Sequence, residues 1–170
     1  MTIDPLDPIS GIPQVTRHHI RDVWQALRSG GAASLPESDR LLGDILQTHA
    51  DDYGFDFSEA DTVAPEDHPP EGEVNPFLHV SVHLAVERQL AEAEPREAVQ
   101  FYNAMRRRQA GHHDTVHLIG AMYSALLYDV IHERRAFDMD RYRRLLHRCS
   151  ALAPELVPQA VADAFDEDES

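Results

Sequence analysis

The chain has 170 residues, of which 42% are hydrophobic, and this is enough for one compact globular domain but not for two independent cores. Its 30 acidic and 15 basic residues give a formal net charge of -15, which argues against nucleic acid or an anionic membrane as a partner. No apolar run is long enough to span a bilayer, and the N-terminus lacks the pattern of a signal peptide, so we expect a cytoplasmic protein.

The charges are unevenly distributed along the chain. Residues 51–73 contain nine acids and residues 155–169 contain six, and neither segment has a lysine or arginine. We therefore predict a single helical domain over 1–154, with a long acidic loop over 51–74, and an acidic, disordered tail over 155–170. All 15 bases are arginine, and either adaptation to salt or the codon bias of a GC-rich genome explains this composition.

Six helices are predicted in chain order. Thr16 is the expected N-cap of the first, which ends at Gly30. The second begins near Ser34 or Ser38 and ends near Asp51. Prolines, glycines and capping residues mark where the remaining four helices begin and end. These signals predict helices over about 75–93, 95–108, 111–135 and from 138 or 140 onward. No alternating strand pattern is present, so the predicted fold is all-α, a bundle of about four main helices with short additional ones.

The helix that begins at Asn75-Pro76 is apolar on most of its sides, which is typical of a central helix. Two histidines, His79 and His83, lie four residues apart on it, and His113 and His117 have the same spacing on a later helix. Residues four apart share a helix face, so each pair can present two imidazoles to one metal ion. If the two helices pack face to face, they supply three or four nitrogen ligands.

Three further residues are candidates for the same site. Glu87 follows His83 by four residues and is a candidate ligand, or a partner that orients an imidazole. His49 ends the apolar face of the second helix, and Asp114 lies beside His113. Because the only cysteine is Cys149, a metal site must use imidazole and carboxylate, which suits a divalent or transition metal, zinc or iron foremost. No nucleotide cofactor is expected.

The histidine pairs are also compatible with a purely structural role. Eleven histidines in this length would give about 0.7 such pairs by chance, and core histidines bonded to carboxylates or carbonyls would also satisfy their buried polar groups. The first hypothesis is a metalloprotein, and an open coordination position would allow metal-assisted hydrolysis or oxygen chemistry. The alternative is a non-enzymatic adaptor or regulatory protein whose acidic loop and tail bind a basic protein. A homodimer is compatible with both, and the sequence leaves open whether the protein is an enzyme.

The segment from Asn75 to Glu87, NPFLHVSVHLAVE, resembles the signature of a bacterial family of small proteins, the domain of unknown function family 1841. That signature reads NPFLH with a second histidine four residues on, in the pattern NPFLHxSxH. The segment GHHDTVH, residues 111–117, is similar to the family's second HxxxH segment, and ILQTHADDY, residues 45–53, is loosely similar to an upstream one. The resemblance implies that the two histidine pairs are a hallmark of the family, but it implies no reaction.

The sequence also departs from the family pattern. The resemblance implies an acidic residue one turn after the second histidine pair and another further along, where this chain has Ala121 and Ala125. The carboxylate complement of the site is therefore open: the protein uses Glu87, Asp114 or Asp129 instead, binds more weakly, or has lost the activity.

Overall fold

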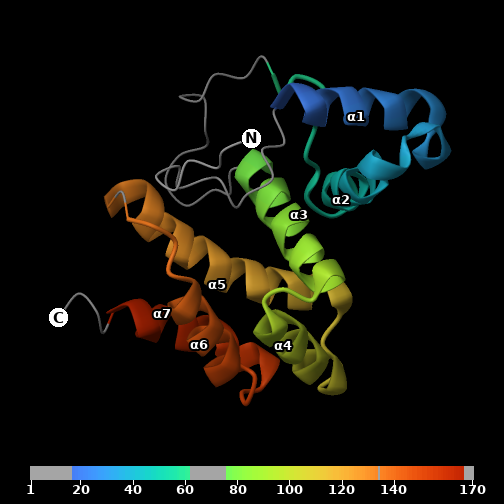
Figure 1. Ribbon diagram of the computed structural model, residues 1–170. Coiled ribbons are helices and arrows are strands. Elements are labelled where there is room, and N and C mark those ends of the chain that lie inside the picture. The colour runs from blue at the N-terminus through green and yellow to red at the C-terminus, as the bar shows by residue number, and fades with distance from the viewer. Residues whose placement is uncertain (1–16, 62–75, 134, 167–170) are drawn as a thin grey trace. The chain divides into compact units, whose positions relative to one another are not determined.

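The computed structural model describes residues 17–61, 76–133 and 135–166, and this part of the chain is helical without any strand (Figure 1). The all-α prediction is confirmed. The α-helices are α1 (Arg17–Gly30), α2 (Glu37–Tyr53), α3 (Pro76–Glu92), α4 (Arg96–Arg107), α5 (His112–Glu133), α6 (Met139–Cys149) and α7 (Val157–Asp166). Two short 3-10 helices, η1 (Ala32–Ser34) and η3 (Pro154–Leu156), accompany them. No helix in the described ranges is both long and apolar enough to cross a membrane.

The six predicted helices correspond to α1 to α6. The expected N-cap Thr16 lies outside the described residues, as do Asn75, where the third helix was expected to begin, and the 62–74 part of the predicted acidic loop. Helix α2 continues to Tyr53, two residues beyond the predicted end. It stops there because Gly54 adopts a left-handed conformation, with φ 68°, and its N–H donates to the carbonyl of Ala50 at 3.0 Å.

Where the sequence predicts one domain, the contacts between Cα atoms group the chain into two compact units, with the boundary inside α3 between Leu84 and Ala85. We call the described residues before this boundary the N-terminal unit and those after it the C-terminal unit. In the N-terminal unit α1 packs against α2, and residues from the start of α3 join the same core. This core consists mainly of aliphatic and aromatic side chains, among them Ile20, Trp24, Leu42, Leu46, Phe57, Phe77, Val80 and Leu84.

In the C-terminal unit, α4 packs against α5 and α6, and α5 also contacts α6 and α7. Tyr142 of α6 is fully buried there, and its hydroxyl donates to Oε1 of Gln89 at 2.8 Å. Burial raises the pKa of the Tyr142 phenol well above its ordinary value. Cys149 is also buried, and burial raises the pKa of its thiol, which is typical of an inert core cysteine.

The segment predicted to be a disordered tail differs from that prediction over most of its length. Helix α7 occupies Val157–Asp166, and Val157 and Val161, four residues apart, are both buried. Two valines at this spacing make an apolar stripe that can pack against α5 and α6. The six acids of the segment outweighed this short stripe in the sequence-based prediction.

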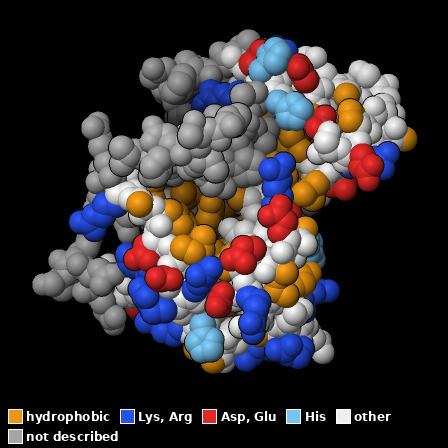
Figure 2. Space-filling model, viewed as in Figure 1, with side chains coloured by type: hydrophobic (Ala, Val, Ile, Leu, Met, Phe, Trp, Pro, Cys, Tyr) orange, Lys and Arg blue, Asp and Glu red, His pale blue; other side chains and the backbone are white. Residues whose placement is uncertain are grey.

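Arginines and carboxylates are interspersed over the visible surface of α4 and α6 (Figure 2). Arg143, for example, has a guanidinium nitrogen 3.0 Å from Oε1 of Glu94 and another 3.7 Å from Oδ1 of Asp140. Side chains of both signs therefore share this face, although the chain as a whole is strongly acidic.

Candidate metal centre

His49 lies near the C-terminal end of α2, at the end of the face that also buries Leu42, Ile45 and Leu46. Its side chain is fully buried, and its Nδ1 lies 2.7 Å from the carbonyl oxygen of Ile45, one turn earlier. Because a carbonyl oxygen only accepts, Nδ1 carries the proton and donates it. The lone pair of the neutral ring is therefore on Nε2, which leaves this atom able to accept a hydrogen bond or bind a metal.

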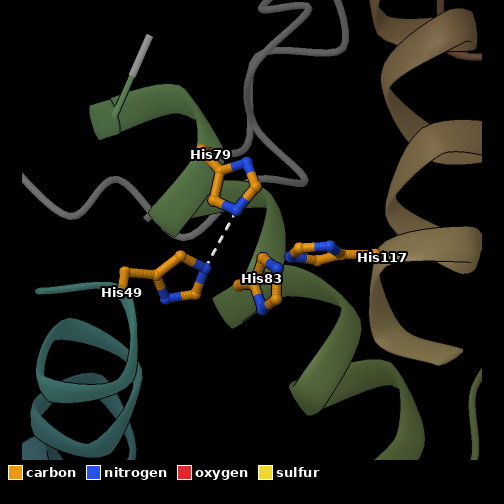
Figure 3. A group of neighbouring side chains, drawn as sticks. All are labelled: His49, His79, His83 and His117. Carbon is orange, nitrogen blue, oxygen red and sulfur yellow. Dashed lines mark hydrogen bonds between the residues drawn. The ribbon is translucent and has the colours of Figure 1, made fainter. Parts of the chain in front are cut away.

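Two histidines of α3 meet His49 within the N-terminal unit (Figure 3). Nε2 of His79 lies 2.9 Å from Nε2 of His49, and the ring centroids are 4.7 Å apart. The ring of His83 lies 4.4 Å from that of His49 and 4.9 Å from that of His79. The spacing of four residues on α3 thus aligns two imidazoles as predicted, and His49 joins them from α2.

The three imidazoles have one ring nitrogen each within 4.8 Å of the others. Zn–N bonds of about 2.0–2.1 Å place neighbouring nitrogens about 3.3 Å apart in a tetrahedral site and about 2.9 Å apart in an octahedral one. The observed separations therefore approach those of a metal site, and side-chain adjustments on the order of 1 Å would bring all three nitrogens to one ion. We call His49, His79 and His83 the histidine triad.

The second histidine pair belongs to the C-terminal unit. His113 and His117 lie on α5, both half-buried, with ring centroids 4.3 Å apart. The predicted alignment of this pair along one helix is therefore found. His113 is not part of any group of three or more close candidate ligands among the described residues. On the same helix, Ala121 is exposed and Ala125 is half-buried, so neither adds a polar group.

Glu87 and Asp114, two of the three candidate carboxylates, have other contacts. Oε1 of Glu87 accepts a hydrogen bond from Nε2 of His112 at 2.7 Å, and Nδ1 of His112 lies 2.8 Å from the hydroxyl of Tyr102. The carboxylate of Asp114 lies over Gly111, where a Cβ would be only 2.8 Å from its Oδ2. This places a negative charge in the first turn of α5, where the helix dipole favours it. Sequence reasoning did not single out His112 or Tyr102.

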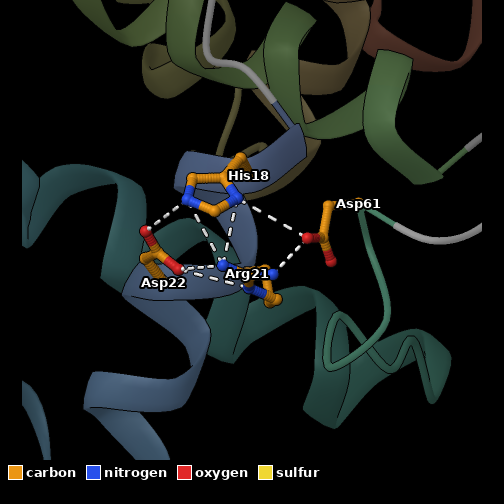
Figure 4. A network of polar contacts seen from close by, with 4 residues as sticks. All are labelled: His18, Arg21, Asp22 and Asp61. Carbon is orange, nitrogen blue, oxygen red and sulfur yellow. Dashed lines mark hydrogen bonds and ion pairs between the residues drawn. The ribbon is translucent and has the colours of Figure 1, made fainter.

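A separate polar network ties the start of α1 to the segment after α2 (Figure 4). The guanidinium of Arg21 pairs with both Asp22 and Asp61, and His18 lies 3.3 Å from Asp22 and 3.5 Å from Asp61. The hydrogen bond between Arg21 and Asp22 lowers the pKa of the Asp22 carboxyl and raises that of the guanidinium. His18 is exposed, and its contacts with Asp22 and Asp61 join the start of α1 to the segment after α2.

The chain is thus an all-α protein in which helices α2 and α3 bring three imidazoles together. It belongs to the family described as domain of unknown function (DUF1841), whose model matches residues 13–148. The resemblance found in the sequence is thereby confirmed at the level of the family. Comparisons with curated proteins and with solved structures give no match.

Proposed function

We propose that the protein binds one first-row transition metal ion, zinc or iron foremost, through the imidazoles of His49, His79 and His83. The convergence of these three rings in the N-terminal unit is the observation that carries the proposal. The hydrogen bond from His49 Nδ1 to the Ile45 carbonyl adds support, because metal-binding histidines commonly donate their second N–H to a carbonyl, which fixes the ring and its tautomer.

The proposal extends the set of ligands predicted from the sequence. His49 moves from an additional candidate to a principal ligand beside His79 and His83. His117 is kept as a proposed further ligand on the strength of the HxxxH pattern alone. His113, Glu87 and Asp114 are left out, because two of them have other contacts and His113 has no group of close candidate ligands around it.

A second candidate function rests on the 2.9 Å contact between His49 and His79. Two neutral imidazoles that share one proton satisfy each other, and burial then needs no ion. In that case the histidine triad is a polar core, and the protein is an adaptor whose acidic segments bind a basic partner. The two functions predict opposite results when the protein is offered a metal.

The metal content of the full chain, purified without a histidine tag, separates them. We expect about one equivalent of metal per chain after exposure to zinc or iron(II) and removal of the excess, measured by inductively coupled plasma mass spectrometry. The His79→Ala variant should not retain this metal. His147→Ala is the matched control, because His147 is an exposed histidine of α6. A His117→Ala variant tests the proposed further ligand, and metal content equal to that of the control would exclude this residue.

The metal proposal fails if the wild-type protein takes up neither metal. It also fails if His79→Ala retains as much metal as His147→Ala. Metal-free protein whose stability does not change with chelator would instead favour the polar core.

A further inference from the structure

Three side chains of the C-terminal unit form a hydrogen-bonded chain outside the histidine triad. Glu87 comes from the second half of α3, Tyr102 from α4, and His112 is the first residue of α5. Nε2 of His112 lies 2.7 Å from Oε1 of Glu87, and its Nδ1 lies 2.8 Å from the hydroxyl oxygen of Tyr102. Both ring nitrogens of one imidazole are thus engaged, one by a carboxylate and one by a phenol.

The direction of each hydrogen bond follows from the partners. An ionised carboxylate can only accept, so Nε2 of His112 carries a proton and donates it to Glu87. In the neutral imidazole the lone pair is then on Nδ1, and the Tyr102 hydroxyl donates to it. The phenol oxygen therefore faces a base that is itself oriented by a carboxylate, which is the arrangement that activates hydroxyl nucleophiles in enzymes.

We propose that Tyr102 is a nucleophilic residue that accepts an acyl group from activated carbonyl compounds, with His112 as its general base and Glu87 as the positioning residue. The Tyr102 oxygen attacks the carbonyl carbon and forms a C–O bond, and the bond between that carbon and the leaving group breaks. The phenol proton passes to Nδ1 of His112 and then to the departing group, which leaves with the bonding electron pair. No change of oxidation state is involved.

Access to the site is compatible with this role. The side chain of His112 is 51% exposed and that of Glu87 is 19% exposed, so the base is open to solvent while its carboxylate partner is largely covered. A covered carboxylate interacts more strongly with an imidazolium than an exposed one does. Glu87 therefore stabilises the charge that develops on His112 when the proton of Tyr102 is transferred.

The absence of lysine makes the site directly testable, because the side chains offer no amine to compete for an acylating reagent. We would treat the full chain with N-hydroxysuccinimidyl acetate near neutral pH and follow the acetylation of each tyrosine by peptide mass spectrometry. Tyr128 of α5 is an internal control, since it is 61% exposed whereas Tyr102 is half-buried. Exposure alone predicts faster acetylation of Tyr128.

General-base assistance contributes roughly 10²–10⁴-fold, so we expect Tyr102 to react about 10-fold faster than Tyr128 or more. His112→Gln keeps a polar side chain but removes the base, and it should bring Tyr102 to or below the rate of Tyr128. Glu87→Gln keeps an acceptor for the N–H of His112 but removes the charge, and it should slow Tyr102 several-fold. If the hydrogen bond between Glu87 and His112 were merely structural, Glu87→Gln would leave the acetylation rate of Tyr102 unchanged.

The rate of Tyr128, measured in the same samples, corrects for differences in reagent concentration and pH between the variants, and circular dichroism reports whether a variant has disturbed the helical fold. The proposal is overturned if Tyr102 reacts no faster than Tyr128 in the wild-type protein, a comparison that needs no variant. It is also overturned if the rate at Tyr102 is the same in His112→Gln as in the wild type.

Discussion

The substitution His49→Leu tests the metal centre most sharply. His49 is completely buried, and leucine has a similar volume, so the variant removes the imidazole without leaving a large cavity in the core of the N-terminal unit. In the metal-free protein the loss of the ring's hydrogen bonds should cost about 1–3 kcal/mol. The main effect should be on the response to metal.

The size of that response can be calculated by linkage. A metal present at about 1,000 times its Kd stabilises the folded state by about 4.1 kcal/mol. For a chain of this size, about 1 kcal/mol corresponds to about 2–4 °C in Tm, so the wild-type protein should gain about 8–16 °C. If the loss of one ligand weakens binding about 100-fold, the same concentration is only about 10 times the Kd of His49→Leu. The gain then falls to about 1.4 kcal/mol, or about 3–6 °C.

The assay is thermal unfolding followed by circular dichroism, in chelator and then in a fixed concentration of zinc or iron(II). His147→Leu serves as the control, because it also replaces a histidine with leucine but at an exposed position. The control should keep the full wild-type gain. Equal gains in His49→Leu and His147→Leu would refute the assignment of His49 as a ligand, and no gain in any of the proteins would refute the metal centre.

Two further predictions concern the C-terminal unit. Because burial raises the pKa of Tyr142 above that of an unfolded phenol, its contribution to stability is complete below about pH 10 and is lost as the pH rises further. Urea unfolding at about pH 8 and about pH 11 should therefore show that the free energy of unfolding falls more between these pH values in the wild type than in Tyr142→Phe. Val157→Ala should lower the free energy of unfolding by about 2 kcal/mol, whereas Leu156→Ala, at a position 55% exposed, should change it by about 0.5 kcal/mol or less. Equal effects of the two alanine variants would mean that α7 does not pack as described.

The helices could be predicted from the sequence because each carries a local signal. Apolar residues three and four apart mark the buried face of α1, and proline begins α3 at its first position. The segment of α7 has a weaker signal, since only Val157 and Val161 are buried in a stretch of ten residues. Its packing depends on α5 and α6, which lie far away in the sequence, and local composition could not reveal that.

The histidine triad could be predicted only in part, for a similar reason. The spacing of His79 and His83 is a property of one helix, so it could be recognised in the sequence. The meeting of His49 with them depends on how α2 packs against α3, and the sequence indicated only that His49 shares an apolar face. The pairing of Glu87 with His112 was missed altogether, because a spacing of four residues selects His113 instead of its neighbour. Which of two adjacent histidines meets Glu87 depends on the rotation of α5 about its axis.

His79, His83 and Glu87 follow one another at intervals of four residues on α3, yet they have different partners. Polar groups on a helix that is apolar on most sides are costly unless a neighbouring helix supplies a partner. For His79 that partner is another imidazole, whereas for Glu87 it is an imidazole that also holds a phenol. The type of partner decides the chemistry of each residue. One face of α3 can therefore contribute to both the proposed metal site and the proposed acylation site. Glu87→Gln should therefore slow acylation of Tyr102 without changing the metal content. His79→Ala should instead lower the metal content without changing the rate of acylation at Tyr102.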